Sequence, residues 1–213
     1  MKLEELGNRM KERLLGPLPG DSAHATLRAT PIGETIPRFE HKLPPKPGGV
    51  LILLYEHGGQ LKFPVIKRQE YRGAHSGQIS LPGGKAEAGE DAVQAALREG
   101  EEEIGVERIK LNVLGTLSDF FVVPSNFIIT PVIATIKSEP FFKPDSYEVA
   151  KILTGSIDDL IKDDAIKQSE LLAAGRYRMM APYFDIEGEV VWGATAMMLN
   201  EFRVILREVF SAG

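Results

Sequence analysis

Three glutamates stand at spacings that a helix would bring together: Glu99, Glu102 and Glu103. Side chains at i, i+3 and i+4 lie on one face of an α-helix. Like charges at such spacings destabilise an isolated helix by about 0.2–0.5 kcal/mol, so we expect a compensating partner. A hard divalent cation with oxygen ligands, Mg²⁺ or Mn²⁺, is the natural candidate. A solvated acidic helix is the ordinary alternative for such a run.

The apolar residues of the same segment predict how this helix is positioned. At about 100° per residue, one narrow stripe is formed by four residues: Val93, Leu97, Gly100 and Ile104. The three glutamates are then expected on the far side, away from the core.

The flanks of the segment favour a site over a solvated helix. Pro82-Gly83-Gly84 precedes the helix, and these glycines let the backbone turn tightly and approach a ligand. Gly105 is a plausible C-cap. Arg98 lies beside the glutamates, where its guanidinium can hold a carboxylate by a bidentate pair.

Residues 84–106 resemble the Nudix box, the signature of the Nudix hydrolases. The matching residues are Gly84, Glu90, Arg98, Glu99, Glu102, Glu103, Gly105 and Val106. Gly100 departs from the pattern, which usually has an aliphatic residue there, and glycine lowers helix propensity by about 1 kcal/mol relative to alanine. No acidic position is lost. The resemblance implies an α/β fold, an α/β/α sandwich with a mixed sheet, and metal-dependent cleavage of a pyrophosphate bond.

Residue roles follow from this resemblance and from the chemistry of phosphoanhydride cleavage. Glu99 and Glu103 are expected to be the primary metal ligands, and Glu102 shares a metal directly or through water. The backbone carbonyl at Gly83 or Gly84 is expected to complete the shell. Glu90 is expected to pair with Arg98 and orient the catalytic face, with a purely structural salt bridge as the alternative.

The general base has two candidates, because Nudix enzymes take it either from the box or from a later loop. Glu148, in the segment Asp145-Ser146-Tyr147-Glu148-Val149, is the candidate outside the box. Glu102 is the candidate within it. An ordinary solvated carboxylate is the alternative reading of Glu148.

The loop before the box indicates a substrate. It holds four groups suited to a polyphosphate with an additional phosphate monoester: Arg68, Arg72, His75 and Gln78. Together with Gly77, they resemble the signature of the coenzyme A diphosphatases, a Nudix subgroup that produces adenosine 3′,5′-bisphosphate and phosphopantetheine. Lys67, Gln69 and Leu81 depart from it, where the subgroup tends to have threonine, serine and phenylalanine.

Coenzyme A or acyl-coenzyme A is therefore the expected substrate. ADP-ribose or another dinucleotide is the alternative among enzymes. A catalytically silent Nudix-fold binding or regulatory module is the alternative from a different class, although every box carboxylate is present.

Composition limits the other possibilities. The 213 residues carry a net charge of −5, which gives no basic footprint for nucleic acid. There are no cysteines, so disulfides, thiolate zinc and a cysteine nucleophile are excluded. No apolar run reaches roughly 18 residues, and the N-terminus lacks an apolar signal core. We expect a cytoplasmic protein with a small-molecule nucleotide substrate and no membrane partner.

The remaining pattern predicts the elements. Residues 1–48 are expected to form a helix over 3–15 and an extended arm, and 49–213 the Nudix domain. The helix is expected to pack on the body of the protein or on a partner subunit, and both segments are candidate elements of a homodimer. Strands are expected at 49–55, 61–68, 110–118, 127–137 and 176–184, with a hairpin turn at 185–188 into 189–193. Helices are expected at 157–174 and 195–210. His24 and His41 lack ligand spacing and are expected on the surface.

Overall fold

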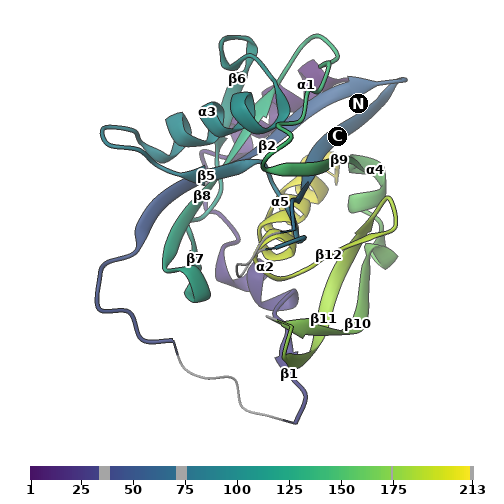
Figure 1. The fold of residues 1–213 in the computed structure, drawn as a ribbon. Helices are drawn as coiled ribbons and strands as arrows, with labels where there is room; N and C mark the ends of the chain where they lie inside the picture. The colour runs from purple at the N-terminus through teal and green to yellow at the C-terminus, as the bar shows by residue number, and fades with distance from the viewer. Residues whose placement is uncertain (34–38, 71–75, 174, 212–213) are drawn as a thin grey trace.

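The computed structural model describes residues 1–33, 39–70, 76–173 and 175–211, and its centre is a mixed eight-stranded sheet (Figure 1). The main path runs β4-β3-β2-β8-β6, while β5 pairs with β2, β7 with β8 and β9 with β3. The two central strands, β2 (Lys46–His57) and β8 (Phe127–Thr135), are parallel. The other strands are β3 (Gln60–Arg68), β4 (Ile79–Ser80), β5 (Gly83–Lys85), β6 (Asn112–Thr116), β7 (Phe120–Val122) and β9 (Val149–Ser156).

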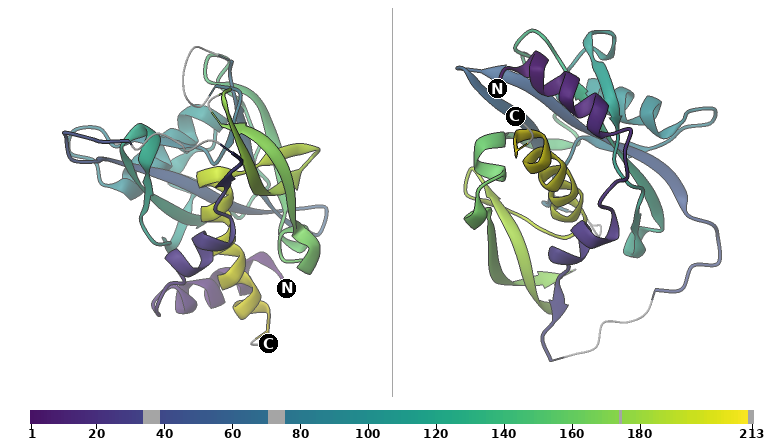
Figure 2. Two further views of the ribbon diagram at one scale, coloured as in Figure 1. Left: turned by 90° about the horizontal axis from the view of Figure 1, so that it is seen from below. Right: turned by 180° about the vertical axis from the view of Figure 1, so that it is seen from behind.

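Strand β2 divides the core into two layers, because successive side chains point to opposite faces of a sheet. Leu51, Leu53 and Tyr55 belong to the cluster that also contains Ala96 and Ile104 of α3 (Ala92–Ile104). The alternate residues of β2 pack with α1 (Leu3–Arg13) and α5 (Gly193–Ser211). Figure 2 shows α1 and α5 together on the face away from α3. The predicted α/β/α sandwich with a mixed sheet is confirmed.

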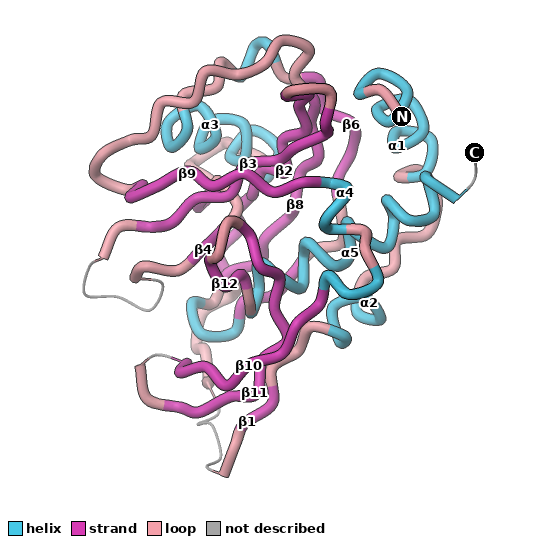
Figure 3. The backbone as a smooth tube through the Cα atoms, turned by 90° about the vertical axis from the view of Figure 1, so that its right-hand side faces the viewer, coloured by secondary structure: helices cyan, strands magenta, loops and turns pink. Residues whose placement is uncertain are grey.

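A second, smaller sheet lies below the first (Figure 3). Its strands are β1 (Thr30–Pro31), β10 (Ile166–Ala173), β11 (Tyr177–Ile186) and β12 (Glu189–Val191). The predicted turn between β11 and β12 is present, with positive φ at Glu187 and Gly188, as a tight hairpin of this kind requires.

The predicted helix over 157–174 is wrong. Helix α4 covers only Ile157–Leu160, a 3₁₀ turn follows at Asp163–Ala165, and the remainder is β10. All eight residues of β10 pair with β11 in antiparallel register. This tertiary pairing outweighs the weak local preference for a helix.

The described part of the N-terminal region contains more helix than was predicted. Helix α1 is confirmed, but a second helix, α2 (Asp21–Thr26), was not predicted. Strand β2 begins at Lys46, so the predicted boundary after residue 48 falls within a strand. His24 is buried, with its Nε2 2.9 Å from Glu201 Oε2, so its expected surface position is wrong. Within the described ranges, no helix is long and apolar enough to cross a membrane.

Candidate active site

Helix α3 has well-defined ends, which fix where its glutamates lie. At its start, the Asp91 side chain accepts a hydrogen bond from the Gln94 N–H at 2.7 Å, and the Gln94 side chain accepts one from the Asp91 N–H at 2.9 Å. This reciprocal capping box satisfies two backbone donors that the helix leaves unpaired. At its end, Gly105 adopts the left-handed conformation with φ of 73°, as the sequence predicted.

Two glycines, one in α3 and one in β5, allow close packing around the helix. A Cβ at Gly100 would lie 2.6 Å from Cδ2 of Leu51 in β2. The departure from the usual aliphatic residue is therefore matched by tight packing of α3 on the sheet. A Cβ at Gly84 would lie 2.4 Å from Glu99 Oε1, so only glycine leaves room for this carboxylate.

Glu103 is the most deeply placed of the three glutamates. Its side chain is 2% exposed, its Oε2 accepts a hydrogen bond from the Gly83 N–H at 2.8 Å, and its Oε1 lies 3.4 Å from Arg68 Nη1. The expectation that all three glutamates face away from the core is thus wrong for Glu103, because the strand containing Gly83 covers this side of the helix. Glu99 is 16% exposed and Glu102 is 59% exposed.

The Arg98 guanidinium donates hydrogen bonds to four residues. Its Nε and Nη2 lie 2.9 and 3.1 Å from the two carboxylate oxygens of Glu90, so the two residues form the predicted pair, in bidentate geometry. Its Nη1 donates to Glu99 Oε1 at 3.0 Å and to Glu102 Oε2 at 2.9 Å, and its Nη2 also donates to the Lys85 carbonyl. The hydrogen bonds from Arg98 lower the pKa of Glu90.

A pocket of about 310 Å³ joins the box to a distant loop. It is lined by Glu99, Glu102, Glu103, Asp145, Tyr147 and Glu148. The candidate base Glu148 thus lies beside the box, with its Oε2 3.8 Å from Arg68 Nη2. Asp145 and Tyr147 were not singled out from the sequence, because only the folded path of the chain brings residues 145–148 to α3.

The carboxyl groups of the site are partly buried and lie close to one another, and the pKa values of Glu103 and Glu99 are raised. Burial raises the pKa of Glu103 to about 7, although the Gly83 N–H and the Arg68 guanidinium act in the opposite direction. Burial likewise raises the pKa of Glu99, against the effect of Arg98. Glu148 adds to the negative charge around both. A bound cation would favour the ionised forms of these groups.

The donor chemistry of the pocket fits Mg²⁺ or Mn²⁺, since both prefer carboxylate oxygens. Across the described ranges, however, no group of three His, Cys, Asp or Glu side chains is gathered closely enough to hold an ion. Glu99 and Glu102 are both bonded to Arg98 Nη1, so an ion would compete with this guanidinium for their oxygens. The carbonyl oxygen of Gly84 lies beside Gly48 in β2. Its predicted role as a ligand stays a prediction.

The loop before the box is described only in part. The Arg68 N–H donates to the Gln78 carbonyl at 3.0 Å, which closes the base of this loop. The Arg68 side chain reaches Glu103 and Glu148 and lies within the carboxylate group. Arg72 and His75, two of the predicted substrate-binding residues, lie outside the described residues.

Comparisons with known proteins agree with this arrangement. The family model described as the NUDIX domain matches residues 45–173. Nudix hydrolase 15, mitochondrial, of Arabidopsis thaliana is 32% identical over 179 residues, which cover 79% of this chain and 60% of that protein. The mitochondrial coenzyme A diphosphatase NUDT8 of Homo sapiens is 29% identical over 161 residues, which cover 74% of this chain and 64% of that protein. The chain thus spans less than two thirds of the length of these two relatives.

A solved structure shares the fold. RenU, a Nudix hydrolase of M. smegmatis, aligns with a TM-score of 0.52 at 18% identity, over 80% of this chain and 88% of that one. At this identity, the likeness concerns the architecture alone.

Proposed function

The chain belongs to the Nudix family, and we propose that it is a metal-dependent pyrophosphohydrolase acting on a nucleoside diphosphate linked to another group. The favoured substrate is coenzyme A or acyl-coenzyme A, with adenosine 3′,5′-bisphosphate and (acyl-)phosphopantetheine as products. One observation carries the proposal: five carboxylates from α3 and the 145–148 loop line a single pocket. Such a donor set suits the divalent ions that assist phosphoryl transfer.

The residues of the pocket have distinct proposed roles. Glu99, Glu102 and Glu103 would close around the ion, because their carboxylates are not gathered closely enough to hold one as they stand. When bound, the ion would supply positive charge for the oxygens of the diphosphate. Arg98 positions Glu99 and Glu102 through its hydrogen bonds to both.

The proposed general base is Glu148, since its exposed carboxylate borders the pocket. It accepts a proton from the attacking water while the P–O bond to the leaving phosphate breaks. Arg68, whose Nη1 and Nη2 face Glu103 and Glu148 respectively, orients both carboxylates. Glu102 is the alternative base, and it is equally exposed.

Two features support coenzyme A among nucleotide substrates. The loop residues Arg68, Arg72, His75 and Gln78 match the coenzyme A diphosphatase signature in type and order. The similarity to the human mitochondrial coenzyme A diphosphatase points in the same direction.

The test is hydrolysis of a small panel with Mg²⁺ or Mn²⁺, with the products identified by mass. The panel contains coenzyme A, an acyl-coenzyme A, dephospho-coenzyme A, ADP-ribose and NADH. We expect preferred cleavage of coenzyme A or its thioester to adenosine 3′,5′-bisphosphate. Preference for ADP-ribose would overturn the substrate, and no turnover of any member would overturn the enzymatic proposal in favour of a binding module.

One variant tests whether Arg72 contacts the 3′-phosphate of coenzyme A or binds phosphate groups in general. If Arg72 binds the 3′-phosphate, Arg72→Ala lowers the rate with coenzyme A more than the rate with dephospho-coenzyme A. An unchanged ratio of the two rates would show that Arg72 does not read this phosphate.

A further inference from the structure

The 145–148 loop is a tightly hydrogen-bonded turn. Oδ1 of Asp145 accepts hydrogen bonds from the N–H groups of Tyr147 and Glu148 at 2.8 and 3.1 Å. The Asp145 carbonyl accepts one from the Val149 N–H at 2.9 Å. This side-chain-capped turn limits the backbone conformations available to Tyr147.

The turn is also fixed to the elements that build the active site. The Asp145 N–H donates to the carbonyl of Glu103 at 3.0 Å. On the other side, Gln69 donates its N–H to the Glu148 carbonyl at 2.9 Å and its Nε2 to the Ser146 carbonyl at 3.0 Å. The loop is therefore held between the C-terminal end of α3 and the end of β3.

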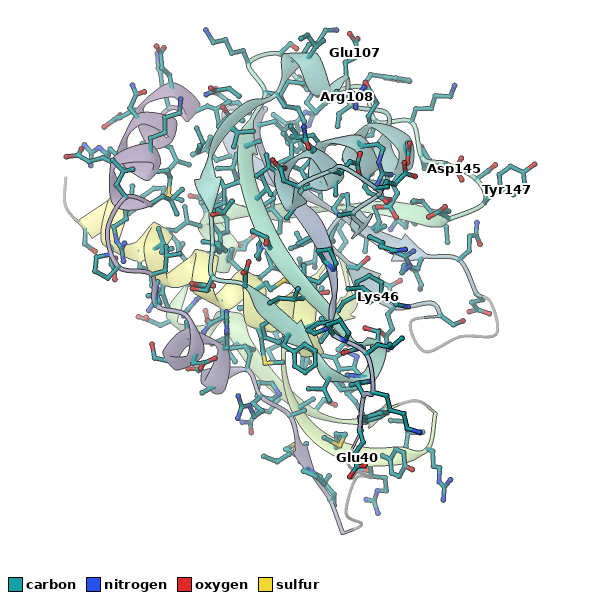
Figure 4. All side chains as sticks on the ribbon, turned by 90° about the vertical axis from the view of Figure 1, so that its left-hand side faces the viewer. Glu40, Lys46, Glu107, Arg108, Asp145 and Tyr147 are labelled. Atoms are coloured by element: carbon teal, nitrogen blue, oxygen red, sulfur yellow. The ribbon has the colours of Figure 1, made fainter. Side chains whose placement is uncertain are left out.

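Tyr147 occupies the tip of this fixed turn. Its side chain is 89% exposed, yet the residue lines the pocket together with Glu99, Glu102 and Glu103. Figure 4 shows it reaching outward beyond Asp145. Among the described residues, its ring has no aromatic or side-chain hydrogen-bonding partner. A large ring is thus presented at the mouth of a pocket whose other lining residues are all carboxylates.

We propose that Tyr147 is a specificity residue that stacks on the nucleobase of the substrate. The inference rests on the proposed function, in which the diphosphate of the bound substrate lies at the carboxylates. The nucleoside part of the same substrate then extends out of the pocket, past Tyr147. A rigidly held aromatic face suits a planar heterocycle, because base–aromatic stacking needs one exposed π-face. The other residues that line this pocket are all carboxylates, so Tyr147 is its one planar aromatic surface among the described residues.

The chain offers a matched control. Phe141 is equally exposed at 89% and precedes the same loop, but it does not line the pocket. Tyr147→Ala removes the stacking face, Tyr147→Phe keeps it, and Phe141→Ala removes an exposed ring elsewhere. None of these changes touches a carboxylate of the site, and surface substitutions of this kind rarely affect folding.

The kinetic test uses two diphosphates that differ only in the base: the preferred nucleotide of the panel and an analogue with hydrogen in place of the base. For Tyr147→Ala we expect KM for the nucleotide to rise about 5- to 100-fold, with kcat nearly unchanged and with the base-free analogue unaffected. Tyr147→Phe and Phe141→Ala should behave as the parent protein. An equal effect of Tyr147→Ala on both diphosphates would overturn the stacking role.

A binding measurement separates this proposal from the function on which it rests. Calorimetric titration with ADP in the presence of Mg²⁺ reports recognition of the base without turnover. Weaker ADP binding by Tyr147→Ala, and not by Phe141→Ala, would support stacking. Unchanged ADP affinity in Tyr147→Ala would overturn it, whereas failure of the parent protein to hydrolyse the panel overturns the proposed function alone.

Discussion

At the scale of single residues, Glu103 is a buried carboxyl surrounded by other negative groups. Glu103 is almost fully buried, and its burial raises the pKa of the carboxyl to about 7. The folded protein keeps this costly group next to Glu99 and Glu148, where removal of the charge would relieve repulsion. Such an arrangement is typical of functional sites, because stability alone would favour a neutral side chain there.

Glu103→Gln tests this assignment directly. The amide oxygen can still accept the hydrogen bond from the Gly83 N–H, while the charge that would hold the ion is lost. We expect kcat with Mg²⁺ to fall about 100-fold or more. The matched control is Glu101→Gln on the same helix, since Glu101 pairs with Arg108 away from the pocket. If Glu103→Gln retains most of the activity, the metal assignment is wrong.

Arg98→Lys tests whether the arginine positions the ligands or is only a structural salt bridge. Lysine keeps the charge but cannot span Glu90, Glu99 and Glu102 with a planar fork. We expect the affinity for Mn²⁺, measured by calorimetry, to fall about 10- to 100-fold, as is typical when the partners of metal ligands are removed. The comparison variant is Arg108→Lys, which lies outside this network. Unchanged Mn²⁺ affinity in Arg98→Lys would leave the structural salt bridge as the explanation.

At the scale of elements, local sequence signals predicted α3 and strand β2, on which it packs. The box glutamates, the C-cap at Gly105 and the apolar run of β2 all act over a few residues, so they are readable without the fold. Strand β10 was mistaken for a helix because its conformation depends on pairing with β11. The burial of Glu103 was missed for the same reason, since it depends on strand β5, whose Gly83 N–H donates a hydrogen bond to Glu103.

The contact between α3 and β2 predicts the effect of a larger residue at position 100. In Gly100→Ala, about 1 kcal/mol gained in helix propensity opposes a clash with Leu51, for which overpacking typically costs about 1–3 kcal/mol. Leu51 is fully buried and has little room to move. We expect a net loss of about 1 kcal/mol in the free energy of unfolding, measured by urea denaturation.

The partner variant is Leu51→Val, which removes the Cδ2 atom that the new Cβ would meet. In this background, Gly100→Ala should become neutral or stabilising, and the double-mutant cycle gives the coupling. Equal effects of Gly100→Ala in both backgrounds would mean that contact with Leu51 does not explain the glycine.

At the scale of the whole molecule, a buried polar cluster joins the N-terminal helices to the C-terminal one. Glu201 of α5 accepts hydrogen bonds from the Gly20 N–H at 3.0 Å and Ser118 Oγ at 2.7 Å, and it lies 2.9 Å from His24 Nε2. Each of these partners is at least 83 residues away from Glu201 in the sequence. No local pattern marks them, so the sequence could not predict that His24 is buried or that α2 packs against α5.

This cluster predicts a loss of stability in acid. Burial alone would raise the pKa of Glu201, but hydrogen bonds from His24, Ser118 and Gly20 outweigh it and lower the pKa below the ordinary value of 4.5. A carboxyl whose pKa is lowered by folding stabilises the protein fully above its unfolded pKa, and this contribution disappears as the pH falls through the folded pKa. The free energy of unfolding should therefore decrease below about pH 4.5.

Glu201→Gln isolates this group from the many surface carboxyls that titrate in the same range. The variant should be less stable than the parent at pH 7 by about 1–3 kcal/mol, because a charged acceptor of three hydrogen bonds is replaced by a neutral one. The difference between the two proteins should shrink as the pH falls below 4.5, since protonation removes the same charge from the parent. Asp21, which lies 3.9 Å from His24 Nδ1 but is exposed, gives the control variant Asp21→Asn. A stability difference between Glu201→Gln and the parent that does not change with pH would show that ionised Glu201 is not what holds the N-terminal helices to α5.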